Sequence, residues 1–187
     1  MARTPSNMLE LGTALPSFSL PDTEGKLITH EQFRNSPLLV IFMCNHCPFV
    51  IHIRPKLAEL TKKYLALGIP TVGINANDVA NYPDDSPEKM KVEKKDAGYS
   101  FPYLFDEKQT VALAFRAACT PDIYLFDKNH CLVYRGQFDD SRPGNSIPVT
   151  GKDLERALQA MVNDETITFE QRPSLGCNIK WKAGNEP

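Results

Sequence analysis

The chain alternates short apolar runs with longer amphipathic stretches, which is the pattern of an α/β domain. Residues 37–43 form a continuous apolar run that a proline opens, and this predicts a strand buried on both faces. The next residues space apolar side chains by three and four, which predicts a helix whose buried face is made of Val50, Ile53, Leu57, Leu60, Tyr64 and Leu67. Gly68 is placed to end this helix, and residues 71–75 follow as a second strand. These segments predict a β-α-β unit.

The rest of the chain repeats this alternation. Ser86-Pro87 predicts the start of a helix that runs to about Ala97, and the polar residues 77–85 before it are interpreted as a surface loop. Pro55 lies in the middle of the first helical pattern and either kinks that helix or divides it into two short ones. Further elements are predicted at residues 103–105, at 106–118 behind a capping box of Asp106 and Gln109, at 120–126, at 132–138 and, after a Thr150–Asp153 cap, at 154–162.

Length and composition fit one globular domain. The chain has 187 residues, of which 42% are hydrophobic and 24% charged, so wholesale disorder and a fibrous fold are excluded. Neither a repeat nor a linker interrupts it, and periodicity becomes weak after residue 163. We therefore expect an N-terminal arm (1–14), a domain (15–163) and a C-terminal tail (164–187) packed on the domain.

Charge and hydropathy exclude two classes of partner. The net charge is −2 and no basic run stands out, so we expect no nucleic-acid partner. The longest apolar stretch, residues 38–43, is too short to span a bilayer, so we expect no membrane partner. The first residues lack the apolar core of a secretory signal, and this predicts a cytoplasmic protein.

Cysteine gives the first sign of chemistry. There are five cysteines, and an odd number in a chain without a secretory signal argues against a disulfide framework. Two of them form Cys44-Asn45-His46-Cys47, where the predicted central strand gives way to the helix. The start of a helix favours an anion and can lower a thiol pKa from about 8.5 to about 3.5–7.5. We expect an exposed Cys44 to attack an external disulfide and a shielded Cys47 to resolve the mixed disulfide.

Four features resemble the thioredoxin superfamily, and specifically its branch of peroxiredoxin-like (AhpC/TSA-type) and TlpA-like proteins. They are the entry at residues 16–25, the strand–CxxC–helix, the helical insertion after Asn75, and Thr120-Pro121 leading into residues 122–127. The resemblance spans about residues 15–163. The segments 138–144 and 173–182 are similar to a peroxiredoxin-like subgroup and imply no particular substrate.

This resemblance implies a thioredoxin-like α/β fold, in which a central mixed β-sheet is flanked by helices on both faces. It also implies that Thr120 and Pro121 form a cis-proline loop facing the CxxC motif, and that the Thr120 backbone pairs with a substrate strand. The implied activity is that of a thiol-disulfide oxidoreductase, in which Cys44 and Cys47 exchange disulfides with proteins or small thiols and need no cofactor. A cytosolic reductant such as thioredoxin or glutathione is expected to recharge it.

The chain departs from thioredoxins around the motif. Met43 stands where thioredoxins have a tryptophan, and Leu38 stands where they bury an acid. The proton acceptor for the resolving cysteine is therefore sought elsewhere, among His46, Asp139 and Asp140. As a cation, His46 would also stabilise the Cys44 thiolate and make the protein more oxidising than thioredoxin; alternatively, it only points to solvent.

Two alternative functions stay open. Peroxiredoxins use P-x-x-x-T-x-x-C, and alignment on Cys47 puts Val40 and Cys44 at the Pro and Thr positions, so we expect weak thiol peroxidase activity at most. Binding of copper or zinc is the other alternative, because thiolates and imidazoles suit these metals and four such residues lie close in sequence: Cys44, His46, Cys47 and His52. The downstream His130 lies in a predicted turn.

The remaining cysteines differ in what they predict. Cys119 precedes the proline loop and is either a third redox thiol or a small buried residue. Cys177 lies in the tail and is a candidate extra resolving thiol, whereas Cys131 opens an edge-like strand and is expected to be structural. Trp181 is expected to anchor the tail by packing. Three charged residues lie close together after residue 138: Asp139, Asp140 and Arg142. They form either an ion-pair cluster near the site or a solvated turn.

Overall fold

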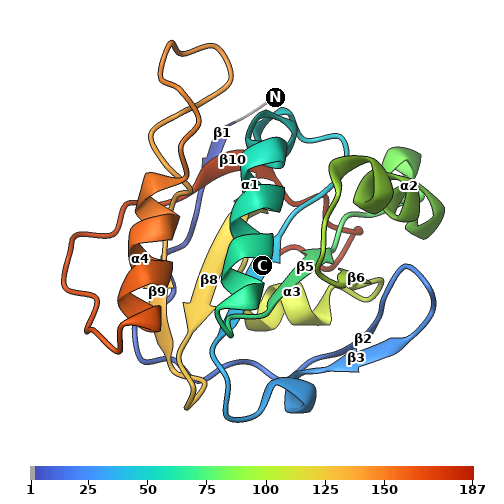
Figure 1. Cartoon of the computed structure of the whole chain (residues 1–187). Helices are drawn as coiled ribbons and strands as arrows, with labels where there is room; N and C mark the ends of the chain where they lie inside the picture. Colours follow the sequence, from blue (N-terminus) through green and yellow to red (C-terminus); the bar gives the residue numbers. More distant parts are fainter. Residues whose placement is uncertain (1–2) are drawn as a thin grey trace.

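The computed structural model describes residues 3–187. Its centre is a five-stranded sheet in the order β6-β5-β4-β8-β9 (Figure 1). β4, β5 and β6 run parallel, and β8 and β9 extend the sheet antiparallel. This confirms the expected mixed sheet, whose strands are β4 (Leu38–Phe42), β5 (Thr71–Asn75), β6 (Tyr103–Phe105), β8 (Asp122–Phe126) and β9 (Leu132–Arg135).

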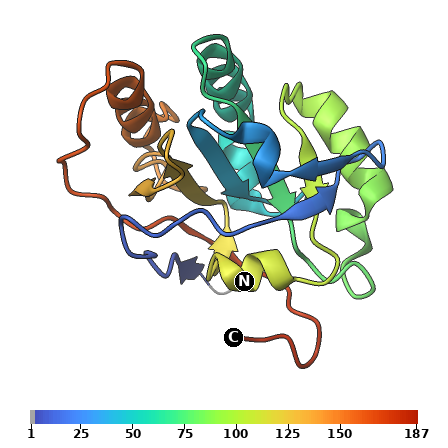
Figure 2. The ribbon, with the colours of Figure 1, turned by 90° about the horizontal axis from the view of Figure 1, so that it is seen from below.

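Helices cover both faces of this sheet. Figure 2 shows α1 and α4 on one side and α3 on the opposite side. The helical elements are α1 (Pro48–Ala66), α2 (Pro87–Ala97), α3 (Thr110–Ala114) and α4 (Lys152–Val162), with the short 3-10 turns η1 (His30–Phe33) and η2 (Pro83–Asp85). No helix within residues 3–187 has both the length and the apolar character that crossing a membrane requires.

The central strand β4 divides the interior into two cores. Its side chains alternate between the faces, so that Leu39 and Ile41 pack under α1 and α4, whereas Val40 and Phe42 pack on the side of α3. All five side chains of β4 are buried. On the α3 side the rings of Phe42 and Phe115 meet edge to face, with centroids 5.2 Å apart. This double burial explains why the strand carries no polar residue.

Two strands from near the ends of the described chain meet in a small sheet beside the central one. β10 (Leu175–Asn178) lies between β1 (Arg3–Pro5) and β7 (Cys119–Thr120) and is antiparallel to both. A separate hairpin joins β2 (Ser19–Pro21) to β3 (Leu27–Thr29). The weakly periodic tail therefore contains a strand, and the division into arm, domain and tail stays a prediction.

Long-range contacts hold the residues after β10. Gln109 does not complete the predicted capping box, because its amide donates to the carbonyls of Ala76 and Lys180. Its carbonyl accepts the Lys182 N–H at 2.8 Å, which ties the tail to the end of β5. Trp181 packs against the α3-side core, as expected of an anchor.

Two helix predictions need correction. α1 runs through Pro55 as a single helix of 19 residues, so the alternative of two short helices is wrong. α4 begins after Gly151, which is its N-cap at φ +70°, and not at a Thr150–Asp153 cap. A Cβ at Gly151 would also approach the ring of Phe138 to 2.8 Å, which accounts for glycine at this entry.

We predict that Phe115→Ala lowers the free energy of unfolding by roughly 3–5 kcal/mol, because a fully buried ring is replaced by a cavity. Urea unfolding followed by circular dichroism measures this change. Val92→Ala, at a side chain that is 54% exposed on α2, is the control and should change stability by less than about 0.5 kcal/mol. Equal effects of the two substitutions would contradict the two-core description.

Candidate active site

The CxxC motif lies where the central strand ends and α1 begins. Cys44 follows β4 by two residues, and Cys47 is the N-cap residue of α1, with Pro48 in the first turn. Both cysteine side chains are buried, at 1% and 0% exposure. The expectation of an exposed Cys44 is therefore wrong. Three neighbouring segments contact the motif: the Thr120 loop, η2 through Asp85, and β10 through Cys177.

Thr120 contacts both thiols of the motif. Its hydroxyl Oγ1 lies 3.5 Å from Cys44 Sγ, and its carbonyl oxygen lies 3.1 Å from Cys47 Sγ. The Thr120–Pro121 peptide bond is cis. The loop implied by the resemblance therefore faces the motif, and Thr120 is the residue that touches it.

The backbone of Thr120 is already paired within the chain. β10 lies antiparallel to β7 with Cys177 opposite Thr120, so the tail takes the place that the sequence analysis reserves for a substrate strand. The Sγ atoms of Cys177 and Cys47 lie 3.0 Å apart. Three sulfur atoms therefore meet at this point, one of them from the far end of the chain.

Hydrogen bonds distribute charge unequally over the motif. Hydrogen bonds from the Cys44 thiol, and further ones from the Thr120 side chain and the Cys177 thiol, lower the pKa of Cys47 to about 5 despite its burial. The contact with Cys47, burial and the negative charge of Asp85 together raise the pKa of Cys44. The anion is therefore favoured at Cys47, and not at Cys44 as the sequence predicts.

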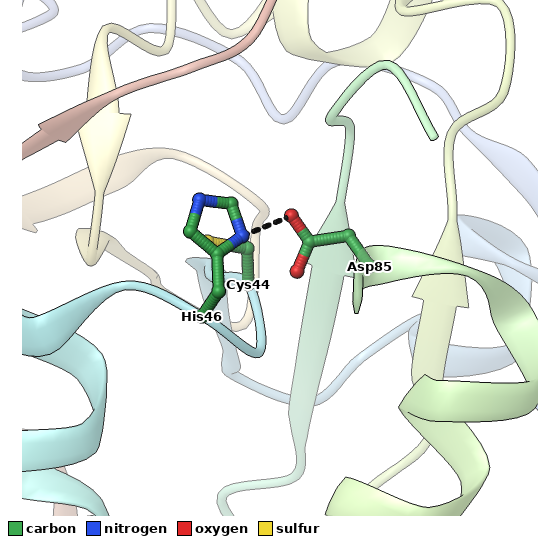
Figure 3. Close-up of side chains that lie close together, drawn as sticks. All are labelled: Cys44, His46 and Asp85. Carbon is green, nitrogen blue, oxygen red and sulfur yellow. Dashed lines mark ion pairs between the residues drawn. The ribbon is translucent and has the colours of Figure 1, made fainter. Parts of the chain in front are cut away.

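Asp85 is a site residue that the sequence analysis missed. The sequence predicts it in the surface loop 77–85, but its side chain is fully buried beside the motif (Figure 3). Its carboxylate accepts the backbone N–H of Asn45 at 2.8 Å and the side-chain amide of Asn77 at 2.7 Å. Asp84 and Asp85 lie just before the start of α2 and belong to no periodic pattern of buried residues. The burial of Asp85 therefore could not be inferred from the sequence.

His46 is paired with this carboxylate. Its Nδ1 lies 2.7 Å from Asp85 Oδ2, and its ring stacks on Tyr82 with centroids 5.7 Å apart. The contact with Asp85 raises the pKa of His46. Burial alone would raise the pKa of Asp85, but the hydrogen bonds from His46 and Asn77 hold it below its usual range. The positive charge of His46, which is expected to stabilise a Cys44 thiolate, is thus balanced by the negative charge of Asp85.

Three atoms of metal-ligand type lie together in this region. They come from Cys44, His46 and Asp85 and lie within 4.8 Å of one another (Figure 3). His52 is not part of this group, since its Nε2 lies 2.7 Å from the hydroxyl of Ser141. His130, whose Nε2 lies 3.0 Å from the carbonyl oxygen of Phe33, is occupied elsewhere. The predicted four-residue set is therefore not assembled.

The other proposed acceptors organise a loop before α4. Asp139 is buried and accepts the backbone N–H groups of Ser141, Thr150 and Gly151. Asp140 is paired with Lys152 and Arg172, and Arg142 donates to the carbonyl oxygen of Asp139. The burial of Asp139 contradicts the solvated-turn alternative. Asp139 is bound by backbone groups of its own loop, whereas Asp140 is paired with α4 and with the tail.

Cys119 and Cys131 lie in different surroundings. Cys119 is fully buried, its Sγ is 3.5 Å from the carbonyl oxygen of Pro121, and burial raises its pKa strongly. These surroundings favour the small buried residue over the third redox thiol. Cys131 is partly buried and bridges Ala14 just before β9.

Comparison with known proteins now identifies the family. Residues 11–135 match the model of the AhpC/TSA family, which is more than half of the chain. The chain belongs to the AhpC/TSA family. Among solved structures, an uncharacterized conserved protein from Geobacillus kaustophilus is 46% identical, with a TM-score of 0.96 over 98% of both chains.

More distant relatives carry functional names. The thiol-disulfide oxidoreductase ResA of Geobacillus kaustophilus is 24% identical over 84% of this chain and 82% of its own length. The thioredoxin domain of a thiol-disulfide oxidoreductase from Bacteroides vulgatus has a TM-score of 0.65 at 19% identity, over 83% of this chain and 99% of its own. The expected thioredoxin-like fold is confirmed, and this AhpC/TSA member has relatives named as redox enzymes.

We predict that Asp85→Asn lowers the pKa of His46, because the negative charge that favours the imidazolium is removed. An NMR titration of the His46 ring measures this. Because the pKa of His46 is raised in the folded protein, the His46–Asp85 pair stabilises the fold below about pH 6.5. This stabilisation is lost as the pH rises through the raised pKa of His46. Asp84→Asn, at the exposed neighbouring acid, is the control. Equal titrations of His46 in both variants would contradict the pairing.

Proposed function

We propose that this protein is a thiol-disulfide oxidoreductase whose redox couple is Cys44 and Cys47. The observation that carries the proposal is that the cis-proline loop contacts both sulfur atoms, at 3.5 Å and 3.1 Å from Thr120. The two thiols stand at the start of α1, where the helix dipole favours an anion. Relatives named thiol-disulfide oxidoreductase agree with this reading.

In the proposed reaction, Cys44 attacks a partner disulfide, the partner S–S bond breaks, and the proton of the Cys44 thiol passes to the partner sulfur that leaves. Cys47 then attacks Cys44 in the mixed disulfide, the bond between Cys44 and the partner breaks, and the second partner sulfur leaves as a thiolate that takes up a proton from water. In the reduced protein, hydrogen bonds lower the pKa of Cys47, and the largest contribution comes from the Cys44 thiol. Thr120 and Cys177 also lower this pKa, and both can still do so when Cys44 is bound to a partner.

The proposed partners are disulfide-containing proteins or small thiols in the cytoplasm, with thioredoxin or glutathione as the reductant. Because β10 pairs with Thr120, a partner strand can pair there only after β10 moves. A weak thiol peroxidase is less favoured, since Val40 is buried in β4 where a peroxiredoxin has its proline. Cys44 also occupies the position of the threonine in the peroxiredoxin motif. The hydroxyl that lies next to the Cys44 thiol belongs to Thr120.

We predict that Cys44→Ser and Cys47→Ser each lower the rate of disulfide reduction by roughly a thousandfold or more, because each removes a reacting sulfur. Reduction of a model protein disulfide at saturating reductant measures this. With the same substrate, Cys47→Ser should accumulate a mixed disulfide on Cys44. Cys131→Ser is the matched control and should keep full activity, whereas activity in all of these variants would exclude the couple.

Zinc binding is a second candidate, favoured by the cluster of Cys44, His46 and Asp85. Three protein ligands with an open position are typical of catalytic zinc. If this is the function, Asp85→Asn should weaken Zn(II) binding by about tenfold or more in a competition titration with a chromogenic chelator, while Asp84→Asn should not. Equal and weak binding by all three proteins would discard this candidate.

A further inference from the structure

A third sulfur atom touches the CxxC motif. Cys177 Sγ lies 3.0 Å from Cys47 Sγ, and the Cys177 side chain is only 2% exposed. A disulfide bond is about 2.0 Å long, so the two sulfurs need to approach by only about 1 Å to form one. The contact joins residues 130 positions apart in the chain.

The strand pairing holds this contact in place from both sides. On one edge of β10, Cys177 is opposite Thr120, and on the other edge it is opposite Arg3. Gly176 permits the close approach, since a Cβ there would lie 1.9 Å from the carbonyl oxygen of Thr120. Any other residue would force β10 away from the motif, so the position of Cys177 depends on glycine at its neighbour.

We propose that Cys177 is a third redox thiol that takes over the disulfide of the CxxC motif. The inference rests on the proposed function, because it requires a Cys44–Cys47 disulfide. Cys177 sulfur attacks Cys47 Sγ, the bond between Cys47 and Cys44 breaks, and the proton of the Cys177 thiol passes to Cys44. One disulfide and one thiol are present before and after, so the exchange needs no further oxidant or reductant.

The exchange has two consequences for the site. It returns Cys44 to the thiol form beside the hydroxyl of Thr120 while the oxidising equivalent stays in the protein. It also links β10 covalently to the motif, so that a partner strand cannot displace it from Thr120. The Cys47–Cys177 form is therefore closed to protein partners until Cys44 reverses the exchange.

Oxidation with glutathione disulfide, followed by alkylation and mass mapping, tests this proposal. The wild-type protein should contain both the Cys44–Cys47 and the Cys47–Cys177 disulfide. Cys177→Ser should contain only the first, and Cys44→Ser should form the second, releasing two equivalents of glutathione. Cys119→Ser, at a buried thiol of the neighbouring strand, is the matched control and should keep both.

The outcomes separate this inference from the proposed function. If Cys177→Ser forms the Cys44–Cys47 disulfide while Cys44→Ser gives only glutathione adducts, the inference is overturned and the proposed function stands. If Cys177→Ser forms no Cys44–Cys47 disulfide, the proposed function fails, whatever Cys177 does.

A variant with all five thiols guards against effects of the cysteine substitutions. Gly176→Ala should push β10 from Thr120 and lower the share of the Cys47–Cys177 disulfide by roughly tenfold or more, because small displacements cost much in reactions between held groups. It should leave the Cys44–Cys47 disulfide in place. An unchanged share of Cys47–Cys177 would overturn the assignment of this pair to the strand contact.

Discussion

The pairing of β10 with β7 is the interaction on which the site depends. It brings the end of the chain to Thr120, the residue that also contacts both thiols of the motif. Because β1 pairs with the other edge of β10, this strand is held on both sides and the start of the chain helps to close the site. Opening the thiols to a partner therefore means separating strands, and this makes access part of the energetics of the reaction.

A second constraint is the fully buried carboxylate of Asp85. A buried charge is costly unless it is paired and hydrogen-bonded, and this one has the Asn45 N–H, the Asn77 amide and the His46 ring as partners. The same contacts fix the loop between the two cysteines. Asp85 thus acts on the motif twice: it holds the backbone of the loop, and its charge disfavours a thiolate at Cys44.

The sequence supports the local parts of this description and not the distant ones. β4 and the amphipathic α1 could be predicted because their buried apolar side chains are consecutive or recur at a regular spacing in the sequence. Asp85 and the β10 contact could not, since a single buried acid has no period and a four-residue strand with a glycine resembles a loop. The exposure of Cys44 was mispredicted for the same reason. What buries it comes from residues far away in the chain.

The contacts of His46 and Cys47 also change the reason for which an oxidising reduction potential is expected. His46 faces Asp85, so its charge adds little to a Cys44 thiolate, but the lowered pKa of Cys47 stabilises the reduced form by about 1.4 kcal/mol, or about 30 mV, for each pKa unit below neutral pH. A second disulfide isomer acts oppositely, because it adds a state to the oxidised form. Two equally populated isomers are worth RT ln 2, about 0.4 kcal/mol or about 9 mV. For the proposed couple the thiolate effect is therefore the larger, and we expect a potential more oxidising than that of an unshifted thiol pair.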